Sequence, residues 1–297
     1  MTTAGNPGAH KWIIGLDLRE RSPGALRFGA WMAAHGGDRV VALHVLEDDE
    51  LHVALRWHHL DEVLAGARTA AETAIDAAGV RASLDAVDVI QGKTAEDALV
   101  AAREAQGADG IVIGRNAPRE GVRAVRLGRV ARKILRALPS PVVVVPPDLD
   151  VASIGKGPVL LACDLDDAGD TAAAFARGFA ERFGRTIELV HIAPMPDAHG
   201  SQYLPVETVT KIRDEHTRVA EQRLVGWAAS HGLDAAIRTV RLGTISDGLV
   251  ELARERDALA IVLGSRKLST IERWLITSAG SDLASHATCP VAVVPPA

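Results

Sequence analysis

Aromatic residues are scarce in this sequence of 297 residues, which contains five Trp, four Phe and one Tyr. The core therefore has to be built from Val, Ile, Leu and Ala, a composition typical of buried parallel strands covered by Ala-rich helices. The hydrophobic share of 47% and the charged share of 24% are those of a folded globular protein, so disorder and a coiled coil are excluded. The composition favours an α/β fold.

Cysteines, long apolar runs and a leader segment are also lacking. Cys163 and Cys289 form no C-x-x-C pair and lie in apolar segments, so disulfide and thiol chemistry are not expected. The longest segment without Asp, Glu, Lys or Arg, residues 283–297, is too short and too rich in Pro to cross a bilayer. The first residues show neither the basic nor the apolar region of a secretory signal. We therefore expect a cytoplasmic protein that does not enter a membrane.

The two halves of the chain repeat the same landmarks in the same order. An apolar segment ends at Asp17 in the first half and at Asp164 in the second, 147 residues later. His44 and His191 are separated by the same number of residues, and the closing segments PVVVVPP and PVAVVPP correspond as well. A constant offset of this kind predicts two tandem copies of one domain.

Each half alternates short apolar segments with helical ones and begins and ends on a strand. The predicted domains are residues 1–150 and 151–297, each a doubly wound parallel sheet of five strands joined by right-handed crossovers. We expect the two copies to pack as a pseudo-two-fold pair through their last apolar strands, since an unpaired apolar edge invites aggregation. A homodimer of the whole chain is left open. The predicted strands are residues 11–17, 39–46, 85–91, 109–114 and 141–146, then 158–164, 186–192, 236–241, 258–264 and 290–295.

Helix starts are marked at corresponding places in the two halves. Thr94 and Thr244 each precede an Asp by three residues, and this Thr-x-x-Asp pattern predicts two capped helices. Ser22 followed by Pro23 predicts another helix start, because Pro is well tolerated in the first helical turn.

Candidate ligand contacts follow from the predicted topology. In a doubly wound sheet, small ligands bind outside the carboxyl ends of the strands, where loops and helix N-termini converge. The residues at those ends are Asp17 and Asp164 after the first strands, His44-Val45 and His191-Ile192 at the second strands, and Gly114 and Gly264 after the fourth strands.

In order and spacing, these residues resemble the universal stress protein family over nearly the whole chain. The family pattern has an Asp ending strand one, a His-Val near the end of strand two, a Gly-x2-Gly-x9-Gly-Ser loop after strand four and a closing Pro-Val-x-Val-Val-Pro strand. The resemblance implies a Rossmann-like fold of the adenine nucleotide alpha hydrolase type. It also implies a stress-response sensor or regulator that binds ATP. An enzyme that cleaves the nucleotide is the last of the interpretations, because no residue can be nominated as its base or nucleophile. By motif position it implicates Asp17, Val45, Ile113, Gly114 and Gly128 in copy one, and Asp164, Ile192, Leu263, Gly264, Gly280 and Ser281 in copy two.

Both glycine loops depart from the family pattern. In copy one, GRNAPREGVRAVRLGR has Ala117 at the second glycine and Arg129 at the serine. In copy two, GSRKLSTIERWLITSAGS has Lys267 at the second glycine but keeps Gly280-Ser281. A Cβ or a longer loop can move backbone N–H groups away from a phosphate. A scaffold or interaction protein without nucleotide therefore stays open as the alternative. We expect copy two to be the better site, because Gly280-Ser281 preserves the helix start and Lys267 adds a cation.

A basic cluster distinguishes copy one. Eight Lys and Arg residues lie between Arg115 and Arg136, against the single acid Glu120. Arginine can hold phosphate bidentately, so Arg129 with its neighbours is a candidate anion site. The alternative is a solvated helix face, with a helix that begins near Gly121 and Arg129 in its middle. The net charge of −5 and the absence of interleaved aromatic residues argue against nucleic-acid binding.

Catalytic and metal sites are not predicted. The sequence has no Gly-x-Ser-x-Gly elbow and no Ser-His-Asp order, and no pair of carboxylates can be assigned to acid and base roles. His52, His58 and His59 lie beside the acidic residues 47–50, but their spacing matches no common metal site. His44 and His191 are expected to be core histidines that are satisfied by hydrogen bonds.

Overall fold

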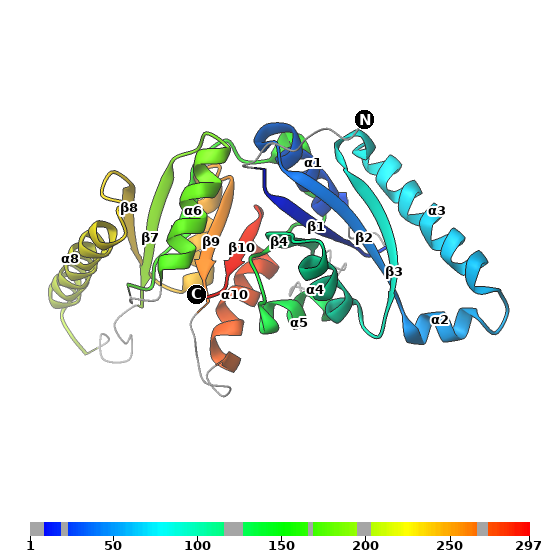
Figure 1. The fold of residues 1–297 in the computed structure, drawn as a ribbon. Helices are drawn as coiled ribbons and strands as arrows, with labels where there is room; N and C mark the ends of the chain where they lie inside the picture. The colour runs from blue at the N-terminus through cyan, green and yellow to red at the C-terminus, as the bar shows by residue number, and fades with distance from the viewer. Residues whose placement is uncertain (1–8, 19–22, 116–126, 166–168, 195–202, 266–272) are drawn as a thin grey trace. The chain divides into compact units, whose positions relative to one another are not determined.

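The computed structural model describes residues 9–18, 23–115, 127–165, 169–194, 203–265 and 273–297. The chain divides into two compact units, Met1–Ile154 and Gly155–Ala297. Each unit contains a parallel sheet of five strands with helices packed on it (Figure 1), which confirms the predicted α/β fold. The pairing of the two copies through their last strands stays a prediction.

The strands have the same spatial order in both units. The order is β3-β2-β1-β4-β5 in unit 1 and β8-β7-β6-β9-β10 in unit 2, and neighbouring strands within each unit pair in parallel. All ten predicted strands are confirmed, with ends that differ by at most two residues. Their bounds are β1 Lys11–Leu16, β2 Arg39–Glu47, β3 Ala86–Gly92, β4 Gly110–Gly114, β5 Val142–Val145, β6 Val159–Ala162, β7 Ile187–Ala193, β8 Ile237–Leu242, β9 Ala260–Gly264 and β10 Val291–Val294.

Helices cover the sheets as crossovers between parallel strands require. In unit 1, α1 packs beside α3 and α4 beside α5, and Figure 1 shows α4 next to α5. In unit 2, α9 packs beside α10. Among the described helices, none combines the length and the apolar composition that crossing a bilayer needs. Their bounds are α1 Pro23–Gly36, α2 Asp48–Ala54, α3 Leu60–Ala78, α4 Ala95–Ala105, α5 Arg129–Ala137, α6 Asp170–Arg182, α8 Val206–Ser230, α9 Ile245–Glu255 and α10 Arg273–His286.

The predicted helix starts are confirmed at α1, α4 and α9. Helix α1 begins at Pro23, and Thr94 and Thr244 are the N-cap residues of α4 and α9. Thr94 Oγ1 accepts a hydrogen bond from the Asp97 backbone N–H at 3.3 Å and donates one to the Asp97 carboxylate at 2.8 Å. Thr244 Oγ1 donates to the Asp247 carboxylate at 2.5 Å. The predicted side-chain cap is thus present at α4 but not at α9, where Thr244 makes no capping hydrogen bond to the helix backbone. Both helices begin just beyond the carboxyl ends of β3 and β8.

The N-terminus of α1 lies directly against the chain that follows β5. The Gly24 backbone N–H donates to the Pro147 carbonyl oxygen at 3.2 Å. A Cβ at Gly24 would lie 1.9 Å from the Pro146 carbonyl oxygen, far inside van der Waals contact. Only glycine therefore allows this approach between the start and the end of unit 1.

Gly24→Ala should destabilise the protein by about 1–3 kcal/mol, because the new methyl group forces a backbone shift against Pro146. Gly66→Ala is the matched control. Gly66 lies in α3, where an added Cβ meets nothing within 4 Å, so this variant should gain about 0.5–1 kcal/mol from helix propensity. Urea unfolding of the full chain, followed by circular dichroism, measures both. Equal stability of Gly24→Ala and the parent chain would contradict the packing described.

Candidate functional site

One cavity, of about 480 Å³, lies at the carboxyl ends of β1, β2 and β4 in unit 1. The strand register explains why these ends converge: Leu16 of β1 pairs with His44 of β2, and Gly15 of β1 pairs with Ile113 of β4. The structure brings together all six residues predicted for this copy. The cavity is lined by Asp17, Val45, Ile113, Gly114, Gly128 and Arg129.

A corresponding cavity, of about 390 Å³, lies at the carboxyl ends of β6, β7 and β9 in unit 2. Ala162 of β6 pairs with Val190 of β7 and with Leu263 of β9, so the same three-strand geometry recurs. Ser281 follows on α10 but is not part of the lining, and Lys267 lies outside the described residues. The predicted residues that line this cavity are Asp164, Ile192, Leu263, Gly264 and Gly280.

The two cavities differ in charge. The lining in unit 1 includes three carboxylates, Asp17, Glu47 and Glu50, together with Arg129. In the described lining of unit 2, Asp164 is the single Asp, Glu, Lys or Arg. Much of the remaining unit 2 wall is apolar, formed by Leu161, Ala162, Ala172, Val190, Ile192, Trp227, Ile245, Leu249, Leu263 and Leu283.

The matching histidines link the first two strands of each unit. His44 Nδ1 lies 3.0 Å from the Leu16 carbonyl oxygen, and His191 Nδ1 lies 2.7 Å from the Cys163 carbonyl oxygen. A carbonyl oxygen only accepts hydrogen bonds, so Nδ1 is the protonated nitrogen that donates in each case. The prediction that both histidines are satisfied by hydrogen bonds is confirmed, but the prediction that they are core residues is wrong. Both rings are half-buried and also line the cavities.

The two cysteines are buried and unpaired with each other. Burial raises the pKa of the Cys163 thiol well above its usual range, and raises the pKa of Cys289 to about 12. Both side chains are therefore neutral thiols at pH 7, the form that is poorly nucleophilic. Cys163 lines the unit 2 cavity as a small apolar group.

His52 contacts its own helix α2, and His58, which precedes α3, contacts the first turn of that helix. His52 Nδ1 lies 2.8 Å from the Asp48 carbonyl oxygen, and His58 Nδ1 lies 3.6 Å from the Glu62 carboxylate. Within the described ranges, no three His, Cys, Asp or Glu side chains converge in a way that could hold a metal ion.

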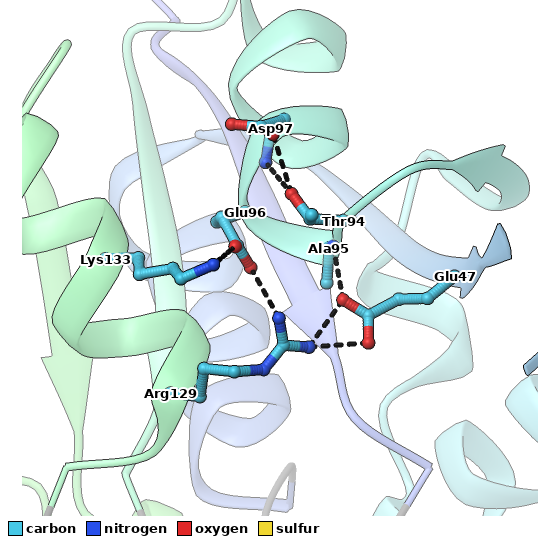
Figure 2. A network of polar contacts seen from close by, with 7 residues as sticks. All are labelled: Glu47, Thr94, Ala95, Glu96, Asp97, Arg129 and Lys133. Carbon is cyan, nitrogen blue, oxygen red and sulfur yellow. Dashed lines mark hydrogen bonds and ion pairs between the residues drawn. The ribbon is translucent and has the colours of Figure 1, made fainter. Parts of the chain in front are cut away.

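Arg129 is held between two carboxylates that the sequence analysis did not single out (Figure 2). Its Nη2 lies 2.5 Å from both carboxylate oxygens of Glu47, and its Nη1 lies 3.4 Å from Glu96 Oε2. Lys133 Nζ donates to the other oxygen of Glu96. Glu47 Oε1 also accepts a hydrogen bond from the Ala95 backbone N–H at 2.8 Å. The carboxylates thus join the end of β2, the start of α4 and the start of α5.

The observed start of α5 shows where Arg129 lies in its helix. Helix α5 begins at Arg129 with Gly128 as its N-cap, so the interpretation in which the helix begins near Gly121 is wrong. A cation at a helix N-terminus opposes the helix dipole, and the carboxylates of Glu47 and Glu96 offset this conflict. The hydrogen bond with Arg129 holds the pKa of Glu47 below its ordinary value. The remaining arginines of the predicted cluster from residues 116 to 126 lie outside the described residues.

The prediction that Gly280-Ser281 forms a helix start is wrong. Helix α10 begins at Arg273, so both residues lie in its interior. The segment RWLITSA that precedes Gly280 contains no Gly or Pro that would end a helix, and it continues the helix toward the N-terminus. Ser281 does not cap α10, and its carbonyl oxygen instead accepts a hydrogen bond from Ser285 Oγ at 2.6 Å.

Comparison with known proteins gives one consistent result. The sequence model of the universal stress protein family matches residues 9–146 and 157–295. A universal stress protein of Mycolicibacterium smegmatis is 27% identical over 296 residues, which cover 96% of either chain. Universal stress protein G of Salmonella typhimurium is 33% identical over 130 residues, covering 43% of this chain and 89% of that protein. A universal stress protein structure from Archaeoglobus fulgidus has a TM-score of 0.64 at 19% identity, covering 97% of this chain and 99% of that one.

Arg129→Ser should lower the free energy of unfolding at pH 7 by about 1 kcal/mol, because it removes the ion pairs with Glu47 and Glu96. The pKa of Glu47 is lower in the folded state than its ordinary value of 4.5. The contribution is therefore present above pH 4.5 and is lost as the pH falls through the lowered pKa. Urea unfolding of parent and variant across this pH range measures the difference.

Arg132→Ser is the control for this prediction. Arg132 is exposed on the same helix and makes no ion pair with the described residues. Its replacement should change the stability by less than about 0.5 kcal/mol at any pH in the series. If the two variants behave alike, the Arg129 network contributes nothing to folding.

Proposed function

This chain belongs to the universal stress protein family, with one copy of the domain in each unit, and on that premise we propose that it binds an adenine nucleotide, ATP, in the cavity of unit 2. It acts as a stress-response sensor or regulator whose bound nucleotide sets its interactions, and not as an enzyme that turns over a substrate. The observation that carries the proposal is the convergence of Asp164, Ile192, Leu263 and Gly264 from three strand ends around one cavity.

The chemistry of this lining suits the adenosine part of the ligand. Asp164 follows β6 at the carboxyl edge of the sheet, and a carboxylate there can accept hydrogen bonds from ribose hydroxyls. The apolar wall, with Trp227 and Leu249 among its residues, offers a purine ring a surface that excludes water. One polar anchor on an apolar wall is the usual composition of a small-molecule site.

Two glycines keep this cavity open. A Cβ added at Gly264 would lie 3.3 Å from the Ala172 Cβ, and one added at Gly280 would lie 3.3 Å from Leu263 Cδ1. Larger side chains at these positions would extend into the space that a ligand needs. The role of Lys267 as a phosphate contact rests on its charge and its place in the glycine loop, since that residue lies outside the described part of the chain.

The alternative is a scaffold of the same fold that binds partners without a nucleotide. The observation that favours it concerns unit 1, where the guanidinium of Arg129 is already paired with the protein's own carboxylates. A cation engaged in this way has less to offer to a phosphate group. The two functions differ in a directly measurable quantity, the nucleotide content of the purified protein.

We expect ATP or another adenine nucleotide to be released when the purified full chain is denatured and its small molecules are analysed by mass. In calorimetric titration, Asp164→Ala and Gly280→Val should each weaken ATP binding about tenfold or more, through loss of a hydrogen-bond acceptor and through filling of the cavity. Gly178→Val is the control, since Gly178 is exposed on α6 and its added Cβ meets nothing within 4 Å. A parent chain that neither carries nor binds a nucleotide would favour the scaffold.

A further inference from the structure

We propose that Glu47 determines the ligand specificity of unit 1, because its carboxylate takes up the donors that a phosphate group would need. The cavity of unit 1 then accepts an adenine nucleoside without phosphate, whereas the cavity of unit 2 accepts the nucleotide. This inference rests on the proposed function, since it assumes that both cavities recognise the adenosine part of the ligand.

The Glu47 carboxylate occupies two donors that could otherwise bind a phosphate group. Glu47 Oε1 and Oε2 both lie 2.5 Å from Arg129 Nη2, and Oε1 also accepts from the Ala95 backbone N–H at 2.8 Å. Ala95 is the first residue of α4, and Arg129 is the first residue of α5. An arginine side chain and a backbone N–H at a helix N-terminus are groups that proteins use to bind phosphate. The Glu47 side chain, 20% exposed, lines the cavity where it meets these donors.

The other charged side chains around the unit 1 cavity also disfavour a phosphate group. Glu96, whose side chain is 8% exposed, pairs with both Arg129 and Lys133, so these two cations already face two carboxylates. Asp17 and Glu50 add two further acids to the lining. A phosphate entering this cavity would meet like charges without a cation left to offset them within the described lining. A nucleoside brings no such charge.

The second copy of the domain supplies an internal comparison. Glu47 lies three residues after His44, and the corresponding position after His191 is Pro194, which lines the unit 2 cavity. Glu96 lies two residues after the N-cap Thr94, and the corresponding residue after Thr244 is Ser246. The copy that lacks both carboxylates is therefore the one whose described lining has a single acid. The difference in ligand follows from two positions on an otherwise shared scaffold.

The test uses the full chain with unit 2 disabled by Asp164→Ala and Gly280→Val, titrated with adenosine and with ATP by calorimetry. With Glu47 intact, adenosine should bind at least tenfold more tightly than ATP. Glu47→Ala should raise the affinity for ATP at least tenfold and change the affinity for adenosine less than threefold. Glu47→Gln, which keeps the size of the side chain but removes its charge, should give a smaller gain in the same direction.

A role of Glu47 in folding alone would shift the binding of both ligands together, so the split between ATP and adenosine separates specificity from stability. Glu104→Ala is the control for net charge, since Glu104 is exposed near the far end of α4 and should leave both affinities unchanged. The inference is overturned if unit 1 of the parent chain binds ATP with the same affinity as adenosine. It is also overturned if neither folded Glu47 variant gains ATP affinity, or if unit 1 binds neither ligand.

A separate variant tests the proposed function, which is the binding of ATP by unit 2. Gly114 lines the unit 1 cavity, so we expect Gly114→Val to obstruct that cavity without touching the lining of unit 2, and its ATP titration then reports unit 2 alone. Absence of ATP binding there overturns nucleotide binding by unit 2. The comparison of adenosine with ATP in unit 1 is decided independently by the first set of variants.

Discussion

Parallel pairing of the strands is the constraint on which the rest of this protein depends. Because all five strands of a unit run in the same direction, their carboxyl ends meet at one edge, and residues far apart in the sequence become neighbours there. The hydrogen bond from His44 to the Leu16 carbonyl oxygen, repeated between His191 and Cys163, ties the first two strands together at this edge. Both cavities are a consequence of this arrangement.

The same scaffold supports two different electrostatic environments. In unit 1 an arginine at the first position of α5 is stabilised by carboxylates from β2 and α4. In unit 2 the corresponding positions are uncharged, and α10 extends past the place where α5 begins. The fold therefore fixes where a ligand can bind, while side chains at a few loop and helix-end positions decide what charge it can carry.

Most strands could be predicted from the sequence because they are short, buried apolar runs, whereas the less buried β3 and β8 were found mainly because the two halves of the chain repeat the same order of segments. The lining residues at strand ends followed from the topology. The start of α10 could not be predicted. The family pattern places its Gly-Ser at a helix start, and the sequence does not show whether Gly280 precedes the helix or lies inside it. Glu47 was missed although a signal existed, since it is an acid at the end of β2 where the second copy has Pro194.

The close approach of Gly24 to the segment 146–147 has a consequence for how the chain is made. Unit 1 joins its first helix to the residues after its last strand, so every residue that it needs, up to Ile154, is synthesised before the strands of unit 2. Unit 2 joins Thr171 to the Pro295 carbonyl oxygen and must wait for that residue. The order of synthesis thus allows unit 1 to fold before the strands of unit 2 are available, as domains generally do when the N-terminal one is made first.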